Sequence, residues 1–170
     1  MKSSFAFIFW GLLLAFLDFS INGFDVLPDA LGFGLVAIGA AGLSRHSPHF
    51  RLASSLCWFL VVAWFVGLFV SGDVAWSFSV LVTTVNLAMH WTLLGGVIDV
   101  ATDQSRLDLA QQAASRRLAY VIILGAGMLI GFVANGSQSL LLVLIFVVPA
   151  IVVSVMVMYV IYRAGRELSV

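Results

Sequence analysis

Charged residues are scarce in this chain. Only 9% of its 170 residues are charged, and its mean hydropathy is +1.14. Because a water-soluble domain carries roughly 25% charged residues, this composition excludes an ordinary soluble fold. Basic and acidic residues are equal at eight each, so the chain lacks the excess positive charge that nucleic-acid binding requires. We therefore expect no nucleic-acid partner.

Cysteine and catalytic motifs are also lacking. Cys57 is the single cysteine, which excludes an intrachain disulfide and a cysteine-pair metal site. The sequence contains no GxSxG, HExxH or P-loop motif. His46 and His49 flank Pro48 in a polar joint, and we interpret them as solvated. The sequence thus predicts a non-enzymatic protein with no catalytic residue, no metal and no cofactor.

Long apolar runs dominate what is present. A helix needs about 20 mostly apolar residues to cross a ~30 Å hydrocarbon layer. The runs that approach this length are residues 4–21, 28–43, 52–70, 74–98, 118–134 and 140–162. They predict an all-α fold, a polytopic transmembrane bundle of about six spans in a single domain, residues 1–170, with five spans as the alternative.

Three details of these runs affect the prediction. The second and fifth are short, so whether they span fully stays open. The polar stretch 103–117 has apolar residues at helical spacing, which predicts a cytoplasmic helix that runs into the fifth span. The first run resembles a signal peptide, but Asp18 interrupts it where a small-x-small cleavage site would be expected. We interpret it as a retained first helix.

The cations predict the orientation of the bundle. Lys and Arg are retained on the cytoplasmic side of short loops. All eight occupy the N-terminus, the joint between the second and third runs, the joint between the fourth and fifth runs, and the C-terminal segment. They are Lys2, Arg45, Arg51, Arg106, Arg116, Arg117, Arg163 and Arg166. The opposite joints, residues 22–27, 71–73 and 135–137, contain none. Both termini are therefore predicted to be cytoplasmic.

A short motif opens the second apolar run. The segment Asp25-Val-Leu-Pro-Asp29-Ala-Leu-Gly32 resembles a pattern, Asp-x-Leu-Pro-Asp-x-x-Gly, in small uncharacterised bacterial polytopic membrane proteins. The resemblance implies a bacterial cytoplasmic (inner) membrane and brings no known activity. Physically, Pro28 suits a first helical turn and Asp29 complements the positive end of the helix dipole. The alternative is a cation site formed by the outer-face carboxylates Asp25 and Asp29, although two acids fall below the usual Ca²⁺ ligand count.

Polar residues inside the predicted spans are the candidate site. Ser79, Thr83, Asn86 and His90 recur at spacings of four, three and four, which places them on one face of the fourth helix. This face predicts either hydrogen-bond contacts between helices or the lining of a ligand or proton path. His90, with a reference pKa of ~6.5, would change charge near neutrality. Asp18 is the candidate intramembrane acid, either capped at the membrane boundary or part of a proton relay.

Small residues mark two predicted packing faces. Gly127, Gly131 and Ala134 are spaced along the fifth run, and Gly32, Gly39 and Gly42 share a face of the second. Small side chains let helix backbones approach closely in a membrane. These faces predict packing within the chain or, alternatively, contact with a membrane-protein partner or a second copy through Gly127 and Gly131 or through Gly32 and Gly39.

Two function classes follow from these patterns. The first is a non-enzymatic structural or accessory subunit of a membrane assembly, favoured by short loops and small-residue faces. The alternative is a small transporter-like or ligand-binding membrane bundle with a polar cavity on the fourth helix. In both, the lipid bilayer is the principal partner.

Overall fold

Six α-helices make up almost all of the fold. The computed structural model describes residues 1–17, 20–21, 24–25, 29–133 and 140–168. The helices are α1 (Lys2–Leu17), α2 (Asp29–Leu43), α3 (Pro48–Gly67), α4 (Asp73–Asp103), α5 (Leu107–Val133) and α6 (Leu140–Glu167). Two-residue strands, β1 (Ser20–Ile21) and β2 (Phe24–Asp25), pair antiparallel between α1 and α2. The predicted all-α class is confirmed for the described residues, apart from this short pairing.

Among the described residues, four helices are long and apolar enough to cross a membrane. These stretches are Pro48–Gly67, Val74–Asp103, Leu107–Ile130 and Ile145–Glu167. α1 and α2 have 16 and 15 residues, or roughly 24 Å at 1.5 Å per residue, which is less than a ~30 Å hydrocarbon layer. α5 runs without a break for 27 residues, through the junction between residues 103–117 and the fifth apolar run. Helix length and composition therefore indicate a membrane protein.

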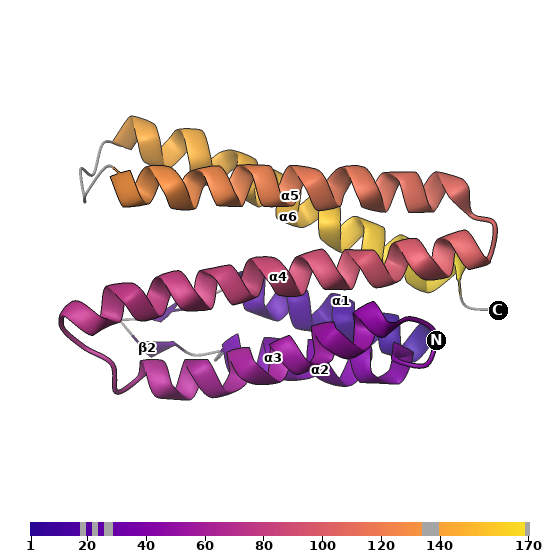
Figure 1. Ribbon diagram of the computed structural model, residues 1–170, viewed down its shortest axis with the longest axis horizontal. Helices are drawn as coiled ribbons and strands as arrows, with labels where there is room; N and C mark the ends of the chain where they lie inside the picture. The colour runs from indigo at the N-terminus through magenta and orange to yellow at the C-terminus, as the bar shows by residue number, and fades with distance from the viewer. Residues whose placement is uncertain (18–19, 22–23, 26–28, 134–139, 169–170) are drawn as a thin grey trace.

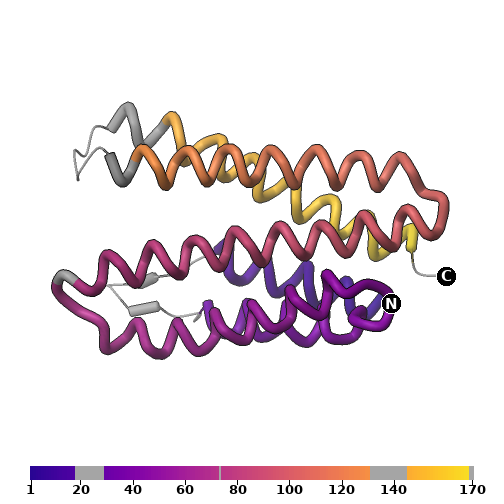
Figure 2. The backbone as a smooth tube through the Cα atoms, in the orientation of Figure 1, coloured from indigo at the N-terminus to yellow at the C-terminus, as the bar shows by residue number. Residues whose placement is uncertain are grey.

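The helices form a closed ring. Each packs on the next in sequence, α1 also packs on α6, and α4 touches α6. Figure 1 shows all six running along the long axis, and Figure 2 traces the same path. The N- and C-termini and the α2–α3 and α4–α5 connections share one end, which we call the terminal end. The β1–β2 pairing and the α3–α4 connection lie at the other, the distal end.

The core is concentrated in the terminal half of the bundle. Fully buried large side chains come from the terminal-end segments of all six helices, among them Phe5, Leu43, Phe50, Leu94, Leu109 and Ile161. By contrast, no residue in 74–88 of α4, 121–130 of α5 or 145–152 of α6 is buried. The bundle is thus tightly packed at the terminal end, whereas α4, α5 and α6 are loosely packed toward the distal end.

Glycines bring the backbones of α1 and α2 into contact. A Cβ built at Gly32 would lie 2.7 Å from the Gly11 carbonyl oxygen, and one at Gly39 would lie 2.5 Å from the Ser4 carbonyl oxygen. The predicted face of α2 is therefore used within the chain. A Cβ at Gly127 meets Phe146 at an ordinary 3.5 Å, and the packing around Gly131 and Ala134 lies outside the described residues.

Candidate functional site: a polar cavity between five helices

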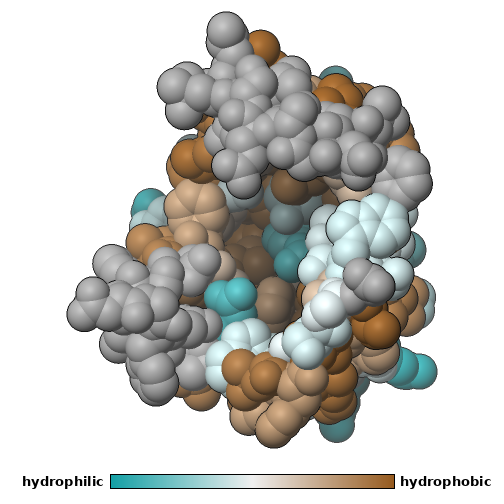
Figure 3. All heavy atoms as spheres, turned by 90° about the vertical axis from the view of Figure 1, so that its left-hand side faces the viewer, coloured by the Kyte–Doolittle hydropathy of each residue, from teal (hydrophilic) through white to brown (hydrophobic). Residues whose placement is uncertain are grey.

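A cavity of about 150 Å³ lies inside the ring, lined by α1, α2, α4, α5 and α6. Its polar lining residues are Asp29, Asn86, His90, Tyr120 and Ser154. Its apolar lining residues are Leu12, Ala15, Phe16, Phe33, Val157 and Met158. Figure 3, which views the molecule from the distal end, shows this face hollowed, with hydrophilic side chains in the hollow. The hollowed distal face thus leads to a polar interior.

The predicted polar stripe of α4 divides into two parts. Asn86 and His90 line the cavity, whereas Ser79 and Thr83 are exposed. Their hydroxyls donate to carbonyls one turn earlier: Ser79 Oγ to Ala75 O at 3.0 Å, and Thr83 Oγ1 to Ser79 O at 2.8 Å. These bonds satisfy the hydroxyls within α4. Thr83 nevertheless lines a second cavity of about 230 Å³, together with Asn86 and with Tyr120 of α5. The stripe therefore faces neighbouring helices from Thr83 to His90.

Tyr120 of α5 packs directly on His90. The two rings are stacked, with centroids 4.3 Å apart and planes 19° from parallel. His90 Nδ1 lies 3.0 Å from the Asn86 carbonyl oxygen. Because a carbonyl only accepts hydrogen bonds, Nδ1 carries the proton, which leaves a lone pair on Nε2 when the ring is neutral. The stacking and this hydrogen bond fix the imidazole in the cavity wall.

Of the three candidate acids, the structure locates the side chain of only one. Asp29, the first residue of α2, lines the cavity. The side chain of Asp25 and all of Asp18 lie outside the described residues, so the carboxylate pair and the intramembrane acid stay predictions. Within the described part of the chain, no group of three or more His, Cys, Asp or Glu side chains could hold a metal ion.

Eight of the lining residues were not predicted from the sequence, and four of these have polar or aromatic side chains: Phe16, Phe33, Tyr120 and Ser154. Ser154 is the one polar residue in the apolar stretch 140–158, and this isolation was the signal that it faces other helices. Phe16, Phe33 and Tyr120 carry no comparable signal, since aromatic residues are common throughout the apolar runs. Their place in the cavity depends on how α1, α2 and α5 pack.

A carboxylate of α4 holds the start of α3 at the terminal end. Ser47, the N-cap of α3, accepts from His49 N at 3.1 Å and donates to Asp99 Oδ2 at 2.5 Å. His49 Nδ1 lies 2.8 Å from the same Asp99 oxygen. The interpretation of His49 as a solvated residue was therefore incomplete, because its ring, though part-exposed, joins α3 to α4.

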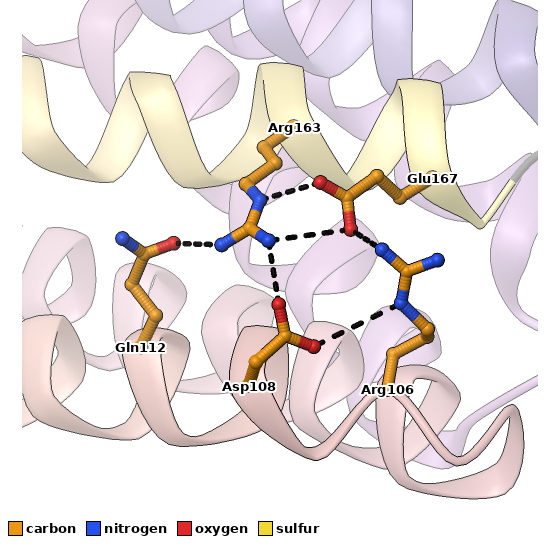
Figure 4. A network of polar contacts seen from close by, with 5 residues as sticks. All are labelled: Arg106, Asp108, Gln112, Arg163 and Glu167. Carbon is orange, nitrogen blue, oxygen red and sulfur yellow. Dashed lines mark hydrogen bonds and ion pairs between the residues drawn. The ribbon is translucent and has the colours of Figure 1, made fainter.

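A second polar network joins α5 to α6 at the terminal end (Figure 4). Arg163 donates to Glu167 Oε1 at 2.5 Å, to Asp108 Oδ2 at 2.5 Å and to Gln112 Oε1 at 3.0 Å. Arg106 pairs with Glu167 and lies 3.8 Å from Asp108. The sequence marked Arg163 and Arg106 only as indicators of orientation. In the structure they bind acids of neighbouring segments and close the terminal end of the bundle.

The chain matches no protein-family model, no curated protein and no solved structure.

Proposed function

We propose that this chain is an integral membrane bundle that binds a small polar solute in the cavity between its helices, as a ligand-binding or transporter-like protein. One observation carries the proposal: polar side chains from α2, α4, α5 and α6 converge on one cavity in a chain that is 62% hydrophobic. Polar groups at membrane depth are costly, and they are usually retained where they line a substrate pathway or a water-filled space. A concave site with a few convergent polar groups is the usual form of a ligand site.

Among the described residues, the cavity is open toward the distal end (Figure 3). The terminal half is filled by buried side chains and closed by the Arg163 and Asp99 networks, whereas the distal half of α4 is uncovered. The cations of the sequence all fall in the N-terminus, the terminal-end connections, the helix ends next to them and the C-terminal segment. By the positive-inside rule this end is cytoplasmic, so we propose that the solute enters from the external face.

Fusion reporters test this orientation. Reporters placed after Arg51, Arg106 and Val170 should give a cytoplasmic signal, because these positions follow joints or segments that contain cations. Reporters placed after Gly23, Asp73 and Gly136 should give an external signal. Alkaline phosphatase and a fluorescent protein, active on opposite sides, provide the measurement. A cytoplasmic signal after Asp73 would contradict the six-span, N-in and C-in arrangement.

Thiol accessibility tests the cavity itself. In a Cys57→Ala background, which removes the buried native thiol, single cysteines at Asn86 and Ser154 should react with a small water-soluble thiol reagent. Cysteines at Leu81 and Val155, which are exposed on the outside of the same helices, should not react, because lipid covers them. Labelling is read by mass shift of protein in intact membranes. Protection at all four positions in folded protein would contradict a hydrated cavity.

An accessory-subunit function is the second candidate. It is favoured by the distal half of α4, where residues 74–88 include no buried residue and Ser79 and Thr83 are exposed. A helix of another membrane protein would cover this face. Co-purification of one stoichiometric membrane partner in mild detergent, abolished by Thr83→Trp, would favour this candidate. In both candidates the chain has no catalytic function, in keeping with the absence of catalytic motifs.

A further inference from the structure

The charge of the cavity lining is negative. Asp29 is the one formally charged side chain among its described lining residues, with histidine counted as neutral. Asp29 also begins α2, where the positive end of the helix dipole favours a carboxylate over a neutral acid. A solute that enters this cavity therefore meets an anionic side chain.

In the sequence, the connections opposite to the termini carry acidic residues and no basic ones. Four of the eight acids, Asp18, Asp25, Asp29 and Asp73, fall in sequence at or beside the connections opposite to the termini, and no Lys or Arg accompanies them. The other four acids share the terminal side with all eight cations. Single-sign charge around a cleft with low-dielectric walls raises the local concentration of the opposite ion. Asp29, the one of these four acids whose side chain the structure describes, therefore favours a cation over an anion in the cavity.

Aromatic rings make up much of the remaining wall. Phe16, Phe33 and Tyr120 line the cavity together with Asp29. A cation within about 6 Å of an aromatic ring is attracted by the ring quadrupole, most strongly where water is excluded. One carboxylate with several aromatic rings is the pattern that binds alkylated ammonium ions. A calcium ion instead needs six to eight oxygen ligands, and the described lining offers few.

We propose that the cavity selects a small organic cation of the alkylammonium class, with Asp29 as its counter-ion and Phe16, Phe33 and Tyr120 around its alkyl groups. This inference rests on the binding function proposed above and adds the class of ligand. The cavity volume of about 150 Å³ limits the ligand to a few non-hydrogen atoms. Asn86 and Ser154 supply hydrogen bonds to a polar substituent.

Matched pairs of probes separate charge from shape. Choline and 3,3-dimethylbutan-1-ol have nearly the same shape but differ by one positive charge. Tetramethylammonium and tert-butanol form a second pair of similar size, in which a hydroxyl also replaces one methyl group. Thermal unfolding of the purified protein in detergent, at constant ionic strength, measures binding because a ligand of the folded state raises the midpoint. We expect each cation to stabilise the protein with an apparent affinity at least tenfold higher than that of its neutral partner.

Asp29→Asn tests the assigned counter-ion. This change keeps the side-chain shape and removes the charge, so the difference between cation and neutral partner should disappear. Asp103→Asn is the matched control, because Asp103 is an exposed acid at the terminal end of α4, and it should retain the difference. The comparison of probe pairs on the unaltered chain does not depend on whether Asp29→Asn folds.

Three results would overturn the inference. Equal stabilisation by the cations and their neutral partners would show that the cavity binds by shape alone, which leaves the proposed binding function in place. A cation effect that survives in folded Asp29→Asn would remove Asp29 as the counter-ion. Absence of any stabilisation would reject the cation class, and if the cavity cysteines were also unreactive, the binding function would fail with it.

Discussion

Gly32→Leu should sharply lower the stability of the bundle, whereas Gly34→Leu on the same helix should change it little. A Cβ at Gly32 would lie 2.7 Å from the Gly11 carbonyl oxygen and 2.8 Å from the Ala15 backbone nitrogen. Overpacking typically costs ~1–3 kcal/mol, and more where the structure cannot adjust. Here the obstructing atoms belong to the backbone of α1, so no rotamer change relieves the clash. We expect a loss of about 3 kcal/mol or more.

Gly34 is the appropriate control because nothing lies within 4 Å of a Cβ built there. Both variants add the same side chain to α2, two residues apart, so differences in helix propensity nearly cancel. The measurement is the free energy of unfolding in mixed micelles of a mild detergent and dodecyl sulfate. Equal losses in the two variants would show that α1 and α2 do not pack through Gly32.

Phe50→Ala should destabilise the bundle by about 3–5 kcal/mol, the range for removing a fully buried phenylalanine. The Phe50 ring is fully buried, contacts Phe5 of α1 edge-to-face at 6.1 Å and 79°, and fills the space over Gly96 of α4. It therefore joins three helices at the terminal end. Its removal leaves a cavity that lipid cannot enter, and the lost dispersion contacts are not replaced.

Phe59→Ala on the same helix provides the comparison. Phe59 is 44% exposed and faces outward, where lipid contacts the shortened side chain in both the folded and the dissociated state. We expect a loss below about 1 kcal/mol, since the change leaves no enclosed cavity. Unfolding in the same mixed micelles measures both variants. A comparable loss at Phe59 would mean that another surface covers α3.

The helices were the part of this fold that the sequence predicted best. Apolar runs of membrane length have one stable backbone solution, because hydrocarbon leaves no hydrogen-bond partner for an open backbone. The glycines of α2 were identified as a packing face from their spacing, but their contact with α1 rather than with a second copy required the structure. Spacing shows which residues share a face and not which helix that face meets.

The cavity was only partly predictable for the same reason. Periodicity put Ser79, Thr83, Asn86 and His90 on one face of α4. Asn86 and His90 reach the cavity and Thr83 lines a second one beside α5, whereas Ser79 is exposed and bonded within its own helix. Tyr120 and Ser154 line the cavity only because the six helices pack into a closed ring, which the spacing of residues does not reveal. The binding of Arg163 to Asp108 and Glu167 was also missed, since the positive-inside rule treats a cation without regard to nearby acids.

The contact of α1 with α6 also bears on how the protein is made. The other extensive helix contacts join sequence neighbours, so they can form as soon as each helical hairpin has been made. The α1–α6 contact joins the first and last of the described helices, and closing so long a loop carries the largest entropic cost. Leu12 and Ala15 of α1 meet Ser154 and Val157 of α6 around the cavity only after this closure. The cavity proposed as the solute site is therefore incomplete until α6 has been made, and a nascent chain that lacks α6 lacks part of its lining.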